Sequence, residues 1–438
     1  MFKFSSLSSL QLFQLIRYGT FILIGICYAK LSLPQSEIGH FETFLLVSGM
    51  VSFFWVSGLI NSMLSIYPKK GEEEKKAVLF NTFVTLFLFS LLAGVLLLVF
   101  SSNLLGFLDK QSDGKLIKLA ILYLLLSNPS FVAEYILYLN DRKTEIVLYG
   151  ASVAFLSLCV AVVPVYYNYP VEYAMYGLIV VALLRLLFTV FLLGRFASFK
   201  FDSGIQLNGI RVSLPLIGSL FVSGSAEYID GILVKAKFDD MFFAVYRYGA
   251  KELPILLIVA NTFSTAMVPV ISGNLQQGLE ELKARSTRLM HIFFPLTMVL
   301  MILSPVIYKY AFSDSFIYSS IIFNIYLLLA IPRFLFPQTV LTGLQHNRYL
   351  LISSLLEITI NVSLSVYLAG KIGLPGIAMG TFVAYTFDKV FLMAVLRFRY
   401  GIKTSSYVTG FVFFSYTFAS LAAFALAHYL FKNGFWGF

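Results

Sequence analysis

The sequence consists of a long succession of apolar runs, each close to the length of a membrane-spanning helix, separated by short polar segments. A bilayer core about 30 Å thick is crossed by a helix of roughly 20 apolar residues, whereas barrel strands alternate apolar and polar residues over about 10 positions. That alternation is absent here. The runs therefore predict an all-α, polytopic membrane protein with about 13 transmembrane helices. We place these at residues 10–29, 41–67, 78–100, 116–139, 146–167, 173–194, 212–234, 242–271, 286–311, 317–343, 349–370, 375–396 and 407–431.

Composition and loop length exclude an additional soluble domain. Of the 438 residues, 59% are hydrophobic and only 12% are charged, far from the proportions of a soluble domain. The longest connections, 101–115, 195–211 and 272–285, are too short to bury a core of their own. We therefore expect the function to be performed within the membrane.

Cysteine and histidine give no sign of a metal site or a disulfide. Cys27 and Cys159 fall inside predicted helices, where they are best explained as small packing residues. The four histidines are scattered singly, without metal-ligand spacing. The first span carries Arg17 and lacks a small-residue cleavage site, so we expect an uncleaved helix. No cofactor is expected beyond a coupling ion.

Basic residues are distributed unevenly between the two sets of loops. With the N-terminus in the cytoplasm, 17 of the 32 lysines and arginines fall at the cytoplasmic face and 9 at the other, and every loop arginine is at the cytoplasmic face. This asymmetry follows the positive-inside rule and predicts a cytoplasmic N-terminus. The net charge of +10 is thereby assigned to a membrane surface, with anionic lipids as partners and no nucleic acid.

Two segments of the chain resemble each other at an offset of 203 residues. Residues 122–131 read LYLLLSNPSF and residues 325–334 read IYLLLAIPRF, with six of ten positions identical, including Pro129 with Pro332. Chance similarity between leucine-rich helices is the alternative. The offset pairs the fourth predicted helix with the tenth.

The same offset carries forward to a second pair of helices. It aligns the segment from Gly177 with that from Gly380 and places Arg185 opposite Asp388. Because partner helices are six apart, an even number, they point the same way across the membrane, as in parallel-repeat transporters. We expect two pseudo-symmetric six-helix lobes around a central cavity, plus one peripheral helix. The expected divisions are residues 1–204, 205–400 and 401–438.

Prolines inside the predicted spans remove backbone hydrogen bonds and permit kinks. Such kinks act as hinges in a transporter or simply shape packing. The prolines are Pro129, Pro254, Pro295, Pro305, Pro332 and Pro337.

Ionisable residues inside the spans are the best candidates for function. Each costs at least ~2.5–3.5 kcal/mol in hydrocarbon, so such residues persist where they are paired or line a wet cavity. Arg17, Arg185 and Arg333 lie near the middle of their spans, with no neutralising neighbour in the sequence. Their guanidinium groups match diphosphate or carboxylate. Glu134 and Glu357 are candidates to carry a coupling H⁺ or Na⁺, or to pair with an arginine on a facing helix.

Four more charges lie at one depth, where the predicted seventh helix ends and the eighth begins. Arg247 and Lys251 are four residues apart and would share a helix face that clamps one anionic group, and Glu227 and Asp230, three apart, would share another. A salt-bridged hairpin without a ligand explains the same pattern. We assign the two basic residues to the candidate substrate site, and the two acids, with Asp388, to candidate ion coupling.

Three segments resemble the polysaccharide flippases, which share a superfamily with the lipid II flippase and the MATE multidrug exporters. YRYGAKELP, from Tyr246, with VPVIS around Pro269, is similar to the eighth helix of that family, and EYIDGILV, with Asp230, to the seventh. TGLQHNRYLLISSLLEITINV, at 342–362, resembles the connection from the tenth to the eleventh helix. The similarity extends over about residues 1–400.

This resemblance implies a monomeric flippase in a bacterial cytoplasmic (inner) membrane. Its partner would be a lipid-linked oligosaccharide, such as an O-antigen precursor, whose diphosphate or acidic sugar is held by arginines in the cleft. Arg17 and Arg247 fall on the first and eighth helices, which carry cavity arginines in the lipid II flippase. That relative has fourteen spans where we predict thirteen, which argues against lipid II as the substrate.

Two other classes of protein remain as alternatives. A MATE-type exporter of cationic drugs would be expected to hold unpaired acids rather than arginines at mid-membrane. A membrane-embedded glycan polymerase or ligase commonly has a long outer loop for its acceptor, and no outer loop here exceeds the 15 residues of 101–115. We therefore expect a transporter and not an enzyme.

Overall fold

The computed structural model describes residues 6–101, 114–346 and 348–433, and the side chains of residues 6–8, 219, 223, 226 and 227 lie outside this description. Over the described ranges the regular structure is entirely helical. Within these ranges, eleven helices are long and apolar enough to cross a membrane, and the number is 13 if each of two bent pairs is one span. The all-α, multi-pass prediction is confirmed. The bent pairs are Gln35–Met50 with Phe53–Lys69, at 45°, and Ser319–Arg333 with Pro337–Gly343, at 41°.

The chain forms two compact units. Unit 1 comprises Met1–Tyr228 with Phe238–Met241, and unit 2 comprises Ile229–Lys237 with Phe242–Phe438. This grouping is based on the contacts between residues. The domain boundaries at residues 204 and 400 were expected from the internal sequence repeat, and they stay a prediction. The central cavity expected between two lobes also stays a prediction.

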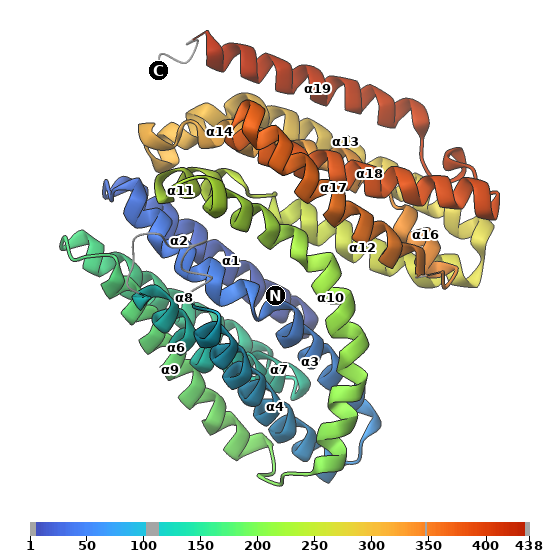
Figure 1. Ribbon diagram of the computed structural model, residues 1–438. Helices are drawn as coiled ribbons and strands as arrows, with labels where there is room; N and C mark the ends of the chain where they lie inside the picture. Colours follow the sequence, from blue (N-terminus) through green and yellow to red (C-terminus); the bar gives the residue numbers. More distant parts are fainter. Residues whose placement is uncertain (1–5, 102–113, 347, 434–438) are drawn as a thin grey trace. The chain divides into compact units, whose positions relative to one another are not determined.

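Unit 1 is a bundle in which α1 packs on α8, and α6 lies between α4 and α9 (Figure 1). At the start of α4, three consecutive glutamates stabilise the positive end of the helix dipole. Two of them pair with lysines one turn later, Glu72 with Lys75 at 2.7 Å and Glu73 with Lys76 at 3.0 Å. The helices are α1 (Ser6–Lys30), α2 (Gln35–Met50), α3 (Phe53–Ile66), α4 (Glu72–Val99), α6 (Lys115–Ser130), α7 (Val132–Leu139), α8 (Lys143–Tyr166), α9 (Glu172–Phe196) and most of α10 (Ser203–Lys237).

Unit 2 is built around a core to which its last helix contributes. The last helix, α19, packs on α13 and α14 and buries Phe413, Ala423 and Ala427, while Phe411 and Phe418 stay exposed (Figure 1). This is a peripheral position within unit 2. The helices are α11 (Asp240–Gly249), α12 (Pro254–Gly273), α13 (Leu275–Ile307), α14 (Ser319–Leu328), α15 (Ala330–Arg333), α16 (Pro337–Gly343), α17 (Arg348–Ile372), α18 (Leu374–Tyr400) and α19 (Gly410–Lys432).

The single helix predicted over 242–271 is wrong, because the chain unwinds between α11 and α12. Leu253 is extended, with φ −67° and ψ 116°, and Pro254 is the first residue of α12. The ring of a proline disfavours the helical conformation in the residue before it and removes a backbone donor. A helix therefore restarts at Pro254 and does not run through it.

Two further helix breaks are related by the sequence repeat. After Pro129, the chain breaks at Phe131, between α6 and α7. After Pro332, α15 ends with Phe334 as its C-cap, and α16 begins at Pro337. The two phenylalanines are separated by 203 residues, the offset found in the sequence. Each proline is thus followed two residues later by an irregularity, which is a single residue with helical φ and ψ inside one continuous span in unit 1 and a bend of 41° in unit 2.

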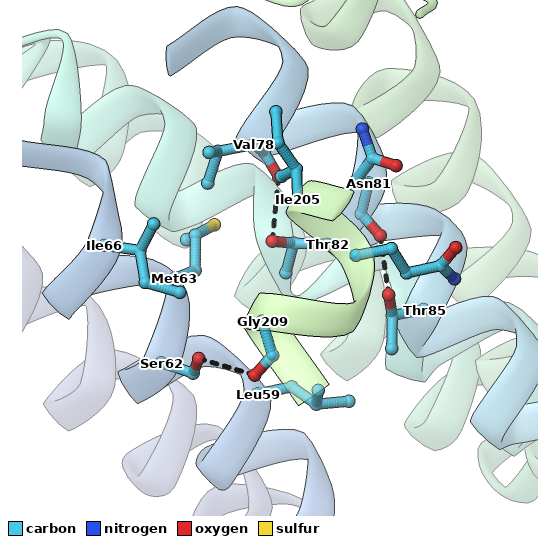
Figure 2. A pocket seen from close by; sticks show the side chains of 11 residues that line it. Leu59, Ser62, Met63, Ile66, Val78, Asn81, Thr82, Thr85, Ile205 and Gly209 are labelled. Atoms are coloured by element: carbon cyan, nitrogen blue, oxygen red, sulfur yellow. Dashed lines mark hydrogen bonds between the residues drawn. The ribbon is translucent and has the colours of Figure 1, made fainter. Parts of the chain in front are cut away.

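A cavity lies among α3, α4 and α10 of unit 1 (Figure 2). Its volume is about 20 Å³. That is room for about one water molecule. Ser62 donates to the Gly209 carbonyl at 2.9 Å across it (Figure 2). Asn81 holds the segment before α10, donating to the Lys200 carbonyl at 3.1 Å and accepting from the Asp202 backbone N–H at 3.1 Å. This region of unit 1 is therefore packed, with no space for a ligand.

Candidate functional site

Unit 1 brings two arginines from distant helices to one carboxylate. The Nη1 atom of Arg17, on α1, lies 3.4 Å from Oε1 of Glu134 on α7, and Nη2 of Arg185, on α9, lies 4.0 Å from Oε2. Arg185 also donates through Nε to the Tyr149 hydroxyl of α8 at 3.3 Å. We name these four residues the arginine cluster. Of the two predicted readings of Glu134, the structure shows the ion-pair partner.

The break between α6 and α7 provides an aromatic surface for both guanidinium groups. Phe131, the residue at the break, has the Arg17 Cζ atom 5.2 Å and the Arg185 Cζ atom 5.1 Å from its ring centroid. Cation–π contacts of this kind stabilise a positive charge without adding a negative one. The proline-induced break thus places the aromatic ring where the two cations meet.

The arginine cluster has one more positive charge than negative. Its side chains differ in exposure, at 38% for Arg17, 9% for Arg185 and 3% for Glu134. Within the described residues, Arg185 Nη2 and Glu134 Oε2 make no hydrogen bond. A buried group that carries excess charge and unused donors favours an anion. Arg17 is the accessible member that such an anion would meet first.

Unit 2 contains a buried carboxylate surrounded by hydroxyl groups. Oδ2 of Asp230, on α10, accepts hydrogen bonds from Tyr246 of α11 at 3.0 Å, Tyr326 of α14 at 2.6 Å and Thr381 of α18 at 2.6 Å. Asp230 is 2% exposed. No lysine or arginine of the described chain forms an ion pair with it. A buried carboxylate without a cation is costly, and these hydroxyls offset only part of that cost.

Two oxygen atoms of this site, one on the carboxylate itself and one on a neighbouring amide, have no hydrogen-bond donor among the described residues. Asn361 of α17 donates to the Thr381 hydroxyl at 3.0 Å, but its own Oδ1, like Oδ1 of Asp230, is buried and makes no hydrogen bond to any described residue. The Ser365 hydroxyl and the Ile377 carbonyl, 3.2 Å apart, lie on the same two helices, α17 and α18. We name these residues, with Tyr246 and Tyr326, the Asp230 cluster.

The chemistry of the Asp230 cluster suits a hard monovalent cation or a proton. Every member offers an oxygen atom, Ile377 through its backbone carbonyl and the others through their side chains, and oxygen atoms are the ligands that hard cations prefer. Across the described residues, no group of three or more His, Cys, Asp or Glu could hold a metal ion such as zinc. One carboxylate supplies a single negative charge.

A second ion-pair network in unit 2 joins two of the helix breaks. Nη2 of Arg333, at the end of α15, lies 2.8 Å and 2.6 Å from the two carboxylate oxygens of Glu252, in the unwound segment before α12. Arg333 Cζ and Lys389 Nζ lie 5.1 Å and 4.5 Å from the Tyr385 ring centroid. Asp388 pairs with Lys389 at 2.9 Å. The half-buried Glu357 of α17 completes this set.

The proposed clamp of Arg247 and Lys251 is not formed as predicted. Arg247 belongs to the last turn of α11, whereas Lys251 lies in the unwound segment beyond it, so the two do not share a helix face. Both make interactions within the structure. The side chain of Glu227 lies outside the described residues. Asp230 faces hydroxyl groups and not a second carboxylate.

Several residues of the two clusters were not predicted because they are neutral. Tyr149, Tyr246, Tyr326, Asn361 and Thr381 contact the charged groups directly. The available signal was the presence of Asn361 within a span, since an amide in hydrocarbon needs a partner just as a charge does. Tyrosine and threonine are too common in spans to have been singled out.

The long apolar helices, the charges buried within them and the absence of strands in the described ranges define a multi-pass, all-α membrane protein. Residues 33–321 match the polysaccharide biosynthesis protein family. The chain therefore belongs to that family. Among curated protein sequences, none is significantly similar to it.

Solved structures of transporters and flippases share this fold. A structure of the lipid II flippase MurJ, in an inward closed conformation, is 15% identical, covers 97% of this chain and 99% of its own, and has a TM-score of 0.68. An inward-facing multidrug resistance MATE family transporter of the MOP superfamily is 13% identical. The match covers 87% of this chain and 94% of the transporter, with a TM-score of 0.62. A MOP superfamily transporter from Pyrococcus furiosus is 15% identical. The match covers 90% of this chain and 94% of the transporter, with a TM-score of 0.53.

Proposed function

We propose that this protein is a flippase that moves a lipid-linked oligosaccharide, of the undecaprenyl-diphosphate type, from the cytoplasmic to the outer leaflet by alternating access. The observation that carries the proposal is the excess positive charge of the arginine cluster, with Arg17 as its accessible member. Guanidinium groups bind phosphate oxygens in a fork geometry. Membership of the polysaccharide biosynthesis family supports a glycan as the cargo.

A monovalent cation, H⁺ or Na⁺, bound at the Asp230 cluster is proposed to drive the cycle. The two buried oxygens without donors, on Asp230 and Asn361, support this assignment. Glu134 is paired with arginines and Asp388 with a lysine, so we favour Asp230 over the other candidate acids. Glu357, which forms no ion pair with any described residue, is the second candidate.

Substitution of Arg17 by Gln tests the substrate assignment. It removes the accessible charge and leaves Arg185 beside Glu134, so we expect transport of a fluorescent lipid-linked oligosaccharide in proteoliposomes to fall about tenfold to a hundredfold, the value of one hydrogen bond to a charged group. Arg17→Lys should retain part of the rate. Lys75→Gln, at a surface pair, is the matched control and should transport normally.

The same variants separate the flippase from the MATE-type alternative. If Arg17→Gln transports the oligosaccharide at the normal rate but alters efflux of a cationic dye, the drug-exporter function is correct and the flippase proposal is wrong. Loss of oligosaccharide transport with no dye efflux in either protein supports the flippase.

Substitution of Asp230 by Asn tests the coupling. The amide keeps the size of the side chain and removes the charge, so we expect transport to become independent of an imposed Na⁺ or pH gradient. Thr381→Ser, which keeps the hydroxyl bonded to Asp230, should remain gradient-dependent. A gradient-driven rate in Asp230→Asn equal to that of the unaltered protein would remove Asp230 from the coupling mechanism.

We also propose that the protein is a monomer in a bacterial cytoplasmic membrane with its N-terminus inside. The positive-inside asymmetry of the loops supports this orientation. In a background without Cys27 and Cys159, an impermeant thiol reagent added to intact cells should label a cysteine at position 168 and not one at 405. The opposite labelling pattern would reverse the orientation.

A further inference from the structure

A group of exposed arginines and aromatic rings lies where two membrane-spanning helices of unit 2 meet. Arg348 is the first residue of α17, and Tyr400 is the last residue of α18. The His346 ring, before α17, stacks on the Tyr400 ring with centroids 4.4 Å apart, and the Tyr349 ring meets Tyr400 edge-on at 6.1 Å. These contacts hold the start of α17 against the end of α18.

Three arginines lie at the two helix ends that carry this aromatic frame. Arg348 donates to the Tyr349 hydroxyl at 3.0 Å and its Cζ lies 4.8 Å from the Tyr349 ring centroid. Arg397 and Arg399 are in the last turn of α18, and Arg399 acts electrostatically on the Tyr349 hydroxyl together with Arg348. All three arginines are exposed. We name these three arginines, with His346, Tyr349 and Tyr400, the Arg348 patch.

The positive charge of the Arg348 patch is not compensated within the described chain. Arg348, Arg397 and Arg399 form no ion pair with any carboxylate of residues 6–101, 114–346 or 348–433, whereas Arg142, Lys143 and Arg285 do. The helix dipole explains the presence of Arg397 and Arg399, because cations stabilise the C-terminal end of α18. It does not explain Arg348, since the N-terminal end of α17 repels a cation.

The corresponding end of unit 1 provides a direct contrast. There Phe196 ends α9, the repeat partner of α18, and Arg142 and Arg195 lie 5.8 Å and 5.1 Å from its ring. However, Arg142 pairs with Glu145 at 3.2 Å, and Lys143 pairs with Asp141 at 3.5 Å. The same arrangement of basic and aromatic residues is thus largely neutralised in unit 1 and left charged in unit 2.

The position of the patch identifies the kind of anion. Both α17 and α18 are candidate membrane spans, so their ends lie at the level of the lipid headgroups. Phe398, between two of the arginines, is 88% exposed, as expected of a side chain placed among acyl chains. Arginine forks bind phosphate, and basic residues at a membrane surface attract anionic lipid.

We propose that the Arg348 patch is a binding site for a phosphate group carried by a membrane lipid. The lipid is either an anionic phospholipid or a polyprenyl diphosphate, which share this chemistry. The proposal goes beyond transport and does not depend on it, because a bound phospholipid would hold this end of unit 2 at the membrane surface whatever the cargo.

Lipid binding to the purified full-length chain tests the proposal. The delipidated protein in a non-ionic detergent is titrated with dioleoylphosphatidylglycerol, dioleoylphosphatidylcholine or farnesyl diphosphate, and bound lipid is counted by native mass spectrometry. The variant Arg348→Gln/Arg397→Gln/Arg399→Gln is compared with Arg142→Gln/Lys143→Gln/Arg195→Gln, which removes three charges from the corresponding end of unit 1. Thermal unfolding without added lipid checks that both variants are folded.

We expect the unit 2 variant to bind phosphatidylglycerol about a hundredfold more weakly, since each basic residue near a charged surface contributes roughly a factor of five. The unit 1 variant should stay within a few-fold of the unaltered protein. If the unit 2 variant loses phosphatidylglycerol binding, the site is assigned to phospholipid. If it loses only farnesyl diphosphate binding, the site is assigned to the polyprenyl carrier. Unchanged binding in the unit 2 variant, or an equal decrease in both variants, overturns the proposal.

Discussion

The buried charges of the two units are organised in opposite ways. In unit 1, two arginines share one glutamate, so the arginine cluster keeps an excess positive charge. In unit 2, Asp230 is surrounded by neutral hydroxyl groups and keeps an excess negative charge. Both groups lie within apolar spans, where unbalanced charge is costly. Each unit therefore holds an unbalanced charge of one sign.

This difference suggests a division of roles between the repeats. A surplus of guanidinium suits an anionic headgroup, and a lone carboxylate with spare oxygen ligands suits a cation. The repeat itself supports divergence, because Arg185 of α9 stands at the position of Asp388 in α18. The aligned positions thus hold a cation in α9 and an acid, paired with Lys389, in α18.

The largest expected effect comes from Arg185→Met in unit 1. The change leaves the buried Glu134 with a single cationic partner, Arg17, whose side chain is 38% exposed, so we expect a loss of about 3–5 kcal/mol in the free energy of unfolding. Thermal unfolding in detergent measures it. Adding Glu134→Gln should restore more than half of the loss. If the single variant unfolds at the normal temperature, buried charge is not what organises unit 1.

A smaller effect is expected from Tyr326→Phe in unit 2. It removes a 2.6 Å hydrogen bond to a carboxylate, which is worth about 1.5–3 kcal/mol. Tyr149→Phe in unit 1 removes a bond to a guanidinium and is the matched variant. Titration of thermal stability with Na⁺, and with pH, should show a response that Tyr326→Phe weakens and Tyr149→Phe leaves intact. Equal responses in the two variants would contradict the division of roles.

The smallest effect is expected at a surface pair. Glu72 is 84% exposed although its distance to Lys75 is only 2.7 Å. Exposed pairs gain little because water screens them. Glu72→Gln should therefore leave the unfolding temperature and transport unchanged. A measurable decrease in the unfolding temperature or in transport would show that the distance between the charged atoms, and not their burial, determines the size of the effects predicted for the two clusters.

The spans and their interruptions were largely predictable from the sequence. Apolar run length gives the helices, and Pro129 and Pro332 mark breaks that the structure places 203 residues apart. The break before Pro254 was predictable too, because proline disfavours the helical conformation in the residue that precedes it. Treating 242–271 as one helix gave too much weight to hydropathy, which does not detect a missing backbone donor.

The partners of the buried charges were much less predictable. Arg17 and Glu134 are 117 residues apart, and Arg333 and Glu252 are 81 apart. Such pairs depend on which helices become neighbours, and a hydropathy pattern does not contain that information. The hydroxyl groups around Asp230 are harder still, because a neutral tyrosine at a helix interface has the same pattern as one that faces lipid.

The single carboxylate of the Asp230 cluster has a thermodynamic consequence. One carboxylate balances one monovalent ion, so a cycle that uses it moves a single elementary charge. At a membrane potential of 100 mV that charge supplies about 2.3 kcal/mol, and each 1.4 kcal/mol is a factor of ten. The electrical energy of that ion alone would then maintain no more than about a fiftyfold ratio of cargo between the leaflets, and any larger ratio must come from the charge of the cargo itself or from its consumption on the far side.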